Sequence, residues 1–279
     1  MGDVIGASER RICTVLGYCR AAMRYATRPR PRDERLKPIL PVLAWMEPRM
    51  GHRRMRQAVC NLLEPISKGA FQRLWQQLKL QVKPRKKRRF RSKTLPAVPG
   101  LRAQYPNEVW CMDFMKDWTL KGFPFRIFSV VDERTRRCLA LVVAPCFKAA
   151  DVVDVLEGLI LRHGTPKNLR SDNGPEFIAT KVQDWATSAG VRLVRSAPAS
   201  PWENPFIESF HSRFRDELSE EQVFGSLVEA QVLCEAYRIW YNEHRPHSAL
   251  KYMTPNRFAA GEEYKLPVPL QAGLEGAAA

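Results

Sequence analysis

The chain has 279 residues and carries 45 Lys and Arg against 29 Asp and Glu, a formal net charge of +16 at pH 7. Hydrophobic residues make up 45% of it, which excludes a disordered chain and a small disulfide scaffold. No apolar run approaches the ~20 residues of a membrane span, and the start of the chain lacks the apolar region of a signal peptide. We therefore expect a soluble, cytoplasmic protein of one or two compact units.

The positive charge is concentrated in the first third of the chain. Residues 1–100 hold 24 Lys and Arg against 6 Asp and Glu, whereas residues 101–279 hold 21 against 23. Eight of the 11 residues from 83 to 93 (KPRKKRRFRSK) are basic, and such a run gains by displacing counterions from a phosphate backbone. Taken alone the run would suit a solvated linker, but the basic character of the whole first third favours a nucleic-acid partner.

The seven cysteines are odd in number and form no CxxC pair. They indicate free, mostly buried thiols in a reducing compartment. His244 and His247 have a ligand-like spacing, but no cysteine pair accompanies them and Pro246 lies between them. Structural zinc is therefore not expected.

The first predicted elements are helices. Residues 7–26 place apolar side chains at helical spacing on either side of Gly17, which predicts two short helices. The prolines of RPRPR (28–32) predict a linker. Two or three helices should follow between 33 and 80, with Asp33 as the cap of the first. Four residues are expected to form the apolar face of that helix: Leu36, Ile39, Leu40 and Leu43.

The stretch 71–80 (FQRLWQQLKL) predicts a further amphipathic helix, because its apolar residues recur every three or four positions. Arginines between these helices suit a small DNA-binding module. A plain helical bundle with a solvated basic face fits this stretch equally well.

After a loop rich in Pro and Gly (94–106), the pattern changes to strands. Apolar, β-branched and aromatic runs predict three consecutive strands, followed by alternating helices and strands. The expected elements are strands at 109–119, 125–135, 138–145, 168–172 and 191–197, and helices at 149–164, 181–189 and 202–218. This order predicts a mixed α/β sheet with helices packed on it, and it is the order of the ribonuclease-H-like fold.

Three acidic residues have unusual positions. Asp113 lies in the middle of the first strand, where an ionised carboxylate is costly unless something pairs with it. Asp172 ends a strand and opens an Asn-Gly turn, and Glu208 lies on a helix with Asn204 as the expected N-cap. Each alone could be a surface charge or a helix cap. Asp117 and Asp132 could be surface charges or groups that support the site from behind, and we favour the surface for both.

Together, the three carboxylates could converge at the edge of the sheet. They would then repel one another and shift each other's pKa. Divalent cations remove that conflict, and hard oxygen ligands suit Mg²⁺ or Mn²⁺ in a site for two ions that act on a phosphodiester. On the helix that carries Glu208, the side chains of His211, Ser212 and Arg215 fall on the same side as the glutamate.

The local sequence around these residues carries a family resemblance. Asp172 and Glu208 are separated by 35 residues and lie within SDNGPEF and SPWENPFIESFHSRFRDEL, and YNEHRPHSALKYMTP follows. With an arginine seven residues after the glutamate, the pattern resembles the second-frame (OrfB) catalytic subunit of bacterial insertion-sequence DDE transposases. The core of that subunit is similar to retroviral integrases.

The resemblance implies a function and a site. Asp113, Asp172 and Glu208 match the catalytic, metal-binding triad, which is expected to hold two Mg²⁺ (or Mn²⁺) ions, and Arg215 matches a residue that contacts the DNA end. The implied reaction is DNA strand cleavage and strand transfer. Further candidates for DNA contacts lie in the basic N-terminal third: Arg53, Arg54, Lys86, Lys87, Arg88 and Arg89.

It also implies a domain organisation: an α/β, ribonuclease-H-like integrase core preceded by a basic helical DNA-binding module. The expected parts are a basic helical segment (1–32), a helix-turn-helix-like module (33–82), a basic linker (83–106), the catalytic core (107–218), a C-terminal helical segment of the core (219–260) and a flexible tail (261–279). The expected partners are the ends and target of the insertion sequence, a first-frame (OrfA) subunit or fusion, and further copies of the chain.

Two other functions remain open on the sequence. The chain departs from the family pattern at several positions: Met50, Leu63, Gly69, Ala70, Pro205 and Lys251. An inactive DNA-binding protein or transposition inhibitor that retains the fold is therefore one alternative. A ribonuclease H acting on RNA–DNA hybrids is the other, and the sequence around Glu208 argues against it.

Overall fold

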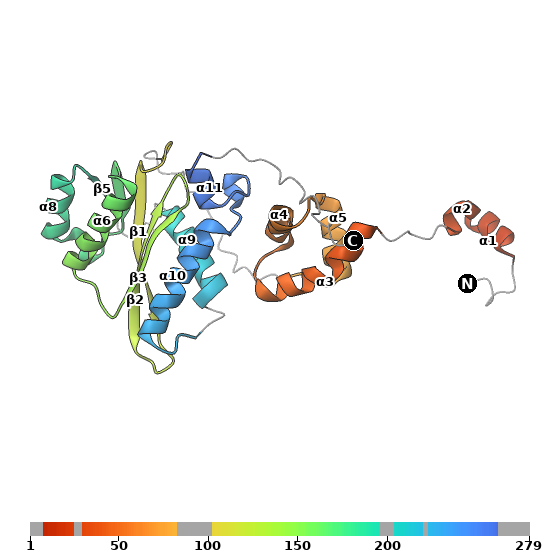
Figure 1. The fold of residues 1–279 in the computed structure, drawn as a ribbon, viewed down its shortest axis with the longest axis horizontal. Helices are drawn as coiled ribbons and strands as arrows, with labels where there is room; N and C mark the ends of the chain where they lie inside the picture. The colour runs from red at the N-terminus through yellow and green to blue at the C-terminus, as the bar shows by residue number, and fades with distance from the viewer. Residues whose placement is uncertain (1–7, 25–29, 83–101, 196–203, 220–222, 262–279) are drawn as a thin grey trace, which may run out of the picture.

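A five-stranded sheet forms the centre of the C-terminal two thirds of the chain. The computed structural model describes residues 8–24, 30–82, 102–195, 204–219 and 223–261 (Figure 1). The strands are β1 (Val109–Trp118), β2 (Pro124–Asp132), β3 (Cys138–Ala144), β4 (Asn168–Ser171) and β5 (Arg192–Arg195). Their order in the sheet is β3-β2-β1-β4-β5. The first three pair antiparallel, whereas β4 runs parallel to β1 and to β5, so the predicted mixed sheet is confirmed.

Helices cover both faces of the sheet (Figure 1). On one face lie α6 (Ala149–His163), the short α7 (Pro175–Ile178) and α8 (Thr180–Ser188). On the other lie α9 (Pro205–Phe214), a π-helical turn (Arg215–Ser219) and α10 (Leu227–Glu243). A 3-10 turn (Ser248–Leu250) and α11 (Pro255–Ala259) follow. Sequence patterns predicted α6, α8 and α9 within a few residues, but not α7, α10, α11, the 3-10 turn or the π-helical turn.

Alternation along β1 assigns its side chains to the two faces. Trp110 and Met112 pack among the residues beneath α6, and Cys111 and Met115 pack against α9 and α10. Asp113 lies two residues from Cys111 and two from Met115, so its side chain is on the same face as theirs. The strand therefore directs this carboxylate to the face covered by α9.

The turn between β2 and β3 is organised by a carboxylate that we expected on the surface. Asp132 is only 2% exposed. Its Oδ1 accepts hydrogen bonds from the Thr135 backbone N–H and hydroxyl, at 2.7 and 2.9 Å, and its Oδ2 accepts one from the Asn107 N–H at 2.7 Å. The prediction of a surface charge was wrong, because donors from its own turn and from Asn107, just before β1, satisfy the buried carboxylate.

The N-terminal helices form a core of their own. The helices α3 (Pro31–Met46), α4 (His52–Leu62) and α5 (Lys68–Gln77) enclose a buried cluster: Leu36, Leu40, Met55, Val59, Phe71 and Leu74. Two short helices, α1 (Glu9–Leu16) and α2 (Arg20–Met23), precede them. Gly17 separates this pair at a φ of 68°, in the left-handed region that favours glycine.

Two details of α3 differ from the prediction. The helix begins at Pro31 with Arg30 in the N-cap position, because proline at the first helical position loses no hydrogen bond. Asp33 is therefore not the cap; it is buried, and its Oδ2 accepts a hydrogen bond from Arg73 Nη2 at 2.8 Å. Ile39, expected on the apolar face, is 37% exposed.

Glu217 joins the helical module to the sheet. This residue lies in the π-helical turn, and its carboxylate accepts two hydrogen bonds from Arg245, at 2.7 and 2.8 Å, and one from Arg54 of α4 at 2.8 Å. Its Oε2 also accepts the hydroxyl of Tyr237 at 3.1 Å. Trp240 of α10 packs against the cores of both units. A buried ion pair and an aromatic side chain thus connect segments far apart in sequence.

Within the residues that the structure describes, no helix is both long and apolar enough to span a membrane. The expected free thiols are confirmed: five of the seven cysteines are buried and none forms a disulfide. The basic run at 83–93 and the tail lie outside the described residues. The boundaries of the six expected parts of the chain stay a prediction.

Substitution of Glu217 tests this connection. Burial alone would raise the pKa of Glu217, but the hydrogen bonds and charges of Arg245 and Arg54 hold the pKa below its usual range. We expect Glu217→Gln to destabilise the protein at pH 7 by about 3–5 kcal/mol, because it leaves buried arginines unpaired. The loss should shrink as the pH falls below about 4, where the wild-type carboxylate is itself protonated.

The measurement is urea unfolding from pH 7 to pH 3.5. Glu235→Gln is the matched control, since Glu235 pairs with Arg238 on the surface of α10 with 52% of its side chain exposed, and exposed pairs contribute little. Equal, small effects of the two substitutions at pH 7 would contradict the structural role of Glu217.

Candidate active site

Asp113 is a partly buried carboxylate in the middle of β1. Its side chain is 27% exposed, and its Oδ1 accepts the Phe114 backbone N–H at 2.7 Å. The pKa of Asp113 is raised to about 6, chiefly by burial and also by the charges of Asp172 and Glu208, while the Phe114 hydrogen bond and Arg215 oppose this rise. The other two carboxylates of the predicted triad are therefore close enough to act on Asp113.

His211 and Ser129 form a hydrogen-bonded pair against Asp113. Ser129 is the partner of Asp113 in the β1–β2 register, and its Oγ lies 3.0 Å from the Asp113 backbone oxygen and 2.6 Å from His211 Nε2. A hydroxyl has one hydrogen. Both bonds therefore form only if Ser129 donates to the carbonyl and the ring donates through Nε2.

That tautomer leaves His211 Nδ1 as an acceptor, 3.6 Å from Asp113 Oδ2. His211 is 8% exposed. Burial and then the charge of Arg215 lower the pKa of His211 to about 3. The ring is thus neutral near pH 7 and lies beside the Asp113 carboxylate without giving it a hydrogen bond or a positive charge.

Asp172 follows directly after β4 and is exposed. Its Oδ1 accepts the Gly174 N–H at 2.9 Å, which closes the predicted Asn-Gly turn. The preceding strand is anchored by a buried ion pair in which Arg170 Nη1 donates to Glu133 Oε2 at 2.7 Å. Since β4 pairs parallel with β1, this anchor sets where the Asp172 side chain leaves the sheet.

Glu208 and Arg215 are presented by α9 and the turn that ends it. Both side chains are exposed, and partial burial raises the pKa of Glu208 above its ordinary value. The helix begins at Pro205 as expected. Asn204 takes the N-cap position, but the prediction that its side chain caps the helix was wrong: its Oδ1 is buried with no hydrogen-bond partner.

The chemistry of the donor set fits a divalent cation. Carboxylate oxygens are hard ligands of the kind that Mg²⁺ prefers, and a cation would remove the repulsion that raises the pKa of Asp113. Among the described residues, no three His, Cys, Asp or Glu side chains are close enough together to hold one ion. The carboxylates would therefore have to move closer to share it.

The candidate DNA contacts are dispersed. Arg215 lies near the carboxylates, since its charge acts on Asp113. Arg53 is exposed on α4, whereas Arg54 on the same helix is half-buried and pairs with Glu217. Four more candidates lie outside the described residues: Lys86, Lys87, Arg88 and Arg89.

Sequence reasoning missed Ser129 and the Glu133–Arg170 pair. The hairpin register gives the signal for Ser129, but it depends on the tight turn at Thr119–Phe123, where Gly122 has a φ of 80°. The expected strand ends give a different register. Nothing local in the sequence distinguishes Glu133 from its charged neighbours.

Known family models match the part of the chain that carries the candidate site. Two models described as integrase core domain match residues 103–201 and 189–255. Together they span β1 to the start of α11, and thus all three carboxylates.

Two relatives match nearly the whole chain. An uncharacterized 31.7 kDa protein of insertion element IS407 from Burkholderia multivorans is 35% identical over 92% of both chains. A 39.2 kDa protein of insertion element IS476 from Xanthomonas euvesicatoria is 32% identical over 96% of this chain and 78% of its own. The transposase InsD of an IS2 element from Escherichia coli is 29% identical over 58% of this chain and 59% of its own.

A solved structure shares the fold. A chain of the simian T-cell lymphotropic virus intasome in complex with a PP2A regulatory subunit superposes with a TM-score of 0.50 at 16% identity, over 64% of this chain and 63% of that one. At such low identity the likeness establishes only the architecture. With the relatives matched along nearly its full length, the chain belongs to the insertion-sequence transposases with an integrase core.

Proposed function

We propose that this protein is the catalytic subunit of a transposase that cuts DNA at the ends of an insertion sequence and joins them to a target. One observation carries the proposal. In a chain of this family, the charges of Asp172, from the end of β4, and Glu208, from α9, act on the partly buried Asp113 carboxylate of β1. A carboxylate whose pKa is raised by burial and by neighbouring carboxylates is a candidate functional group.

The reaction is two transfers of a phosphoryl group. In the first, water attacks the phosphorus at the element's end, its oxygen forms the new bond, and the bond to the 3′ oxygen breaks, which leaves a 3′ hydroxyl. In the second, that hydroxyl attacks a phosphodiester of the target and displaces another 3′ hydroxyl. Neither step needs a covalent enzyme intermediate or an oxidant.

The residues of the candidate site have different roles in this reaction. Asp113, Asp172 and Glu208 would hold two Mg²⁺ or Mn²⁺ ions, which when bound neutralise the phosphate and polarise the attacking oxygen. His211, held by Ser129, packs beside Asp113 and limits the access of water to it. Arg215 contacts the DNA end beside the carboxylates.

The partners follow from the reaction. Two DNA ends must be brought together, so we propose that the chain acts as a multimer with a first-frame subunit or as a fusion to it, on bacterial DNA in the cytoplasm. The basic module and the run at 83–93 would hold further DNA.

The separation of the carboxylates in the structure favours a second candidate, an inactive DNA-binding protein or transposition inhibitor of the same fold. It predicts DNA binding without metal-dependent cleavage. The first prediction below separates the two functions.

Asp172→Asn should reduce strand cleavage and joining on the element's end DNA by at least about 100-fold, the loss typical when one electrostatic group of an active site is removed. Asparagine keeps the Oδ1 that accepts the Gly174 N–H, so the turn should fold. The assay uses Mg²⁺ or Mn²⁺ and the chain fused to its upstream frame, with gel analysis of cleaved and joined products.

Asp184→Asn, on an exposed residue of α8, is the control and should retain full activity. Full activity of both variants would refute the triad. An inactive, folded, DNA-binding wild type would establish the second candidate.

Asp113→Asn should stabilise the metal-free protein while abolishing cleavage. The substitution removes a buried charge near two others, and a pKa raised to about 6 corresponds to a gain of up to about 3 kcal/mol at pH 8. Denaturant unfolding in EDTA measures it, again with Asp184→Asn as the neutral comparison. A destabilised Asp113→Asn protein would show that the carboxylate has a structural role instead.

A further inference from the structure

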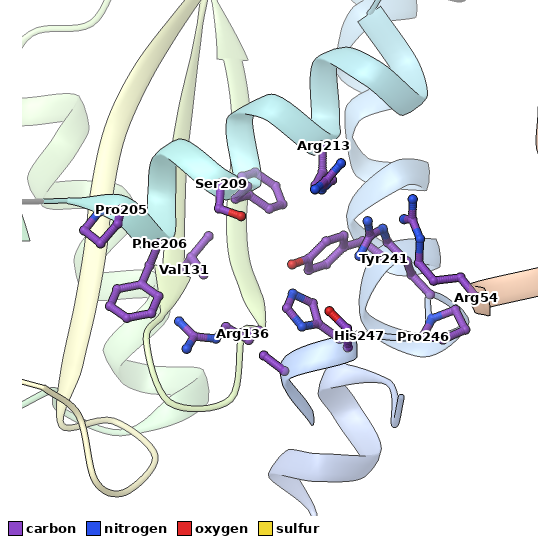
Figure 2. Close-up of a pocket in the computed structure, with 14 residues that line it drawn as sticks. Arg54, Val131, Arg136, Pro205, Phe206, Ser209, Arg213, Tyr241, Pro246 and His247 are labelled. Atoms are coloured by element: carbon purple, nitrogen blue, oxygen red, sulfur yellow. The ribbon is translucent and has the colours of Figure 1, made fainter. Parts of the chain in front are cut away.

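A cavity on another side of α9 is lined by four arginines. It has a volume of about 390 Å³, within the range of about 300–1,000 Å³ typical of ligand sites. Figure 2 shows it between α9 and the segment that follows α10. Arg54, Arg136, Arg213 and Arg245 line it, whereas none of the three triad carboxylates does.

The charges around this cavity are not balanced. Arg54 and Arg245 share one carboxylate, that of Glu217. Arg213 lies 3.6 Å from Asp216, with 47% of its side chain exposed. Arg136 completes the set without a carboxylate within ion-pair distance in the described residues, so the lining carries excess positive charge.

Arg136 is held there at a cost. Its φ is 63°, in the left-handed region that a bulky side chain rarely adopts. Its guanidinium lies 3.9 Å from the centre of the Phe206 ring, and its Nη1 is buried with no hydrogen-bond partner in the part of the chain that the structure describes. Burial lowers the pKa of Arg136. Backbone strain together with an unsatisfied buried donor indicates a residue kept for binding.

His247 adds a second unsatisfied group. Its Nδ1 is buried without a hydrogen-bond partner, and Figure 2 shows the ring among the lining side chains. Burial, followed by the charges of Arg245, Arg136, Arg54 and Arg213, lowers the pKa of His247 to about 3. The lowered pKa of His247 thus reflects the positive charge of all four lining arginines.

We propose that this cavity binds a phosphate group. Phosphate oxygens accept several hydrogen bonds at once, and guanidinium groups match them in charge and geometry. The phosphate could belong to a free ligand or to the backbone of bound DNA. Because Arg54 comes from the helical module and Arg245 from the end of the α10 region, an occupant would touch both units.

The first arm of the test uses pyrophosphate without divalent metal or DNA, so it does not depend on the proposed function. At about 100 times its Kd, pyrophosphate should raise the Tm of the wild type by roughly 5 °C or more. Arg136→Gln/Arg213→Gln should lose this shift. The control Arg192→Gln/Arg195→Gln has the same net charge, changes two exposed residues of β5, and should keep it.

If the double variant does not fold, Arg213→Gln alone, at an exposed position, replaces it in this measurement. This single substitution should weaken pyrophosphate binding about tenfold. Matched ionic strength in sodium chloride excludes general screening.

The second arm rests on the proposed function and measures the salt dependence of DNA binding. Loss of one phosphate contact should flatten the slope of log K against log salt by about 0.9 in Arg136→Gln/Arg213→Gln relative to the control. A flatter slope assigns the cavity to a DNA phosphate. A Tm shift with an unchanged slope assigns it to a free phosphate ligand. If pyrophosphate causes no Tm shift and the slope is not flatter, the proposal is overturned.

Discussion

The burial of charged side chains determines the structure on the side of the sheet that α9 covers. Two carboxylates are buried there to different degrees, and they are satisfied differently. Glu217 is met by Arg245, Arg54 and Tyr237 and holds the helical module against the core. Asp113 receives a backbone hydrogen bond and faces a neutral His211, with other carboxylates nearby. The first arrangement stabilises the fold, and the second leaves a site whose repulsion a cation would relieve.

The positive side chains show the same contrast. Arg170 forms an ion pair with Glu133 inside the sheet, and this pair anchors the strand before Asp172. Arg136, by comparison, has a strained backbone and is half-buried, and its buried Nη1 has no hydrogen-bond partner among the described residues. In a protein of this charge, most arginines are exposed and uninformative singly. The informative arginines are those whose buried nitrogens have no partner among the described residues to offset the loss of hydration.

Periodicity and turn residues were sufficient to predict the five strands and the helices α6, α8 and α9, because each depends on local spacing of apolar residues. The resemblance around Asp172 and Glu208 located the candidate site. Contacts between distant segments could not be predicted. The burial of Asp132 depends on donors from Asn107 and Thr135, and the pairing of Arg54 with Glu217 joins residues 163 positions apart. The start of α3 was misplaced because proline at its first position outweighed Asp33 as a cap.

The sheet order also fixes when the site can exist during synthesis. Asp113 belongs to the β1–β2 hairpin, whose pairing is local, whereas β4 adds Asp172 across a long connection and α9 adds Glu208 later still. Local pairings form early and non-local ones late, and the ribosome delivers the N-terminal part first. The helical module is therefore complete while the nascent chain still lacks two of the three carboxylates. A product truncated at this stage would contain the proposed DNA-binding module without the proposed catalytic site.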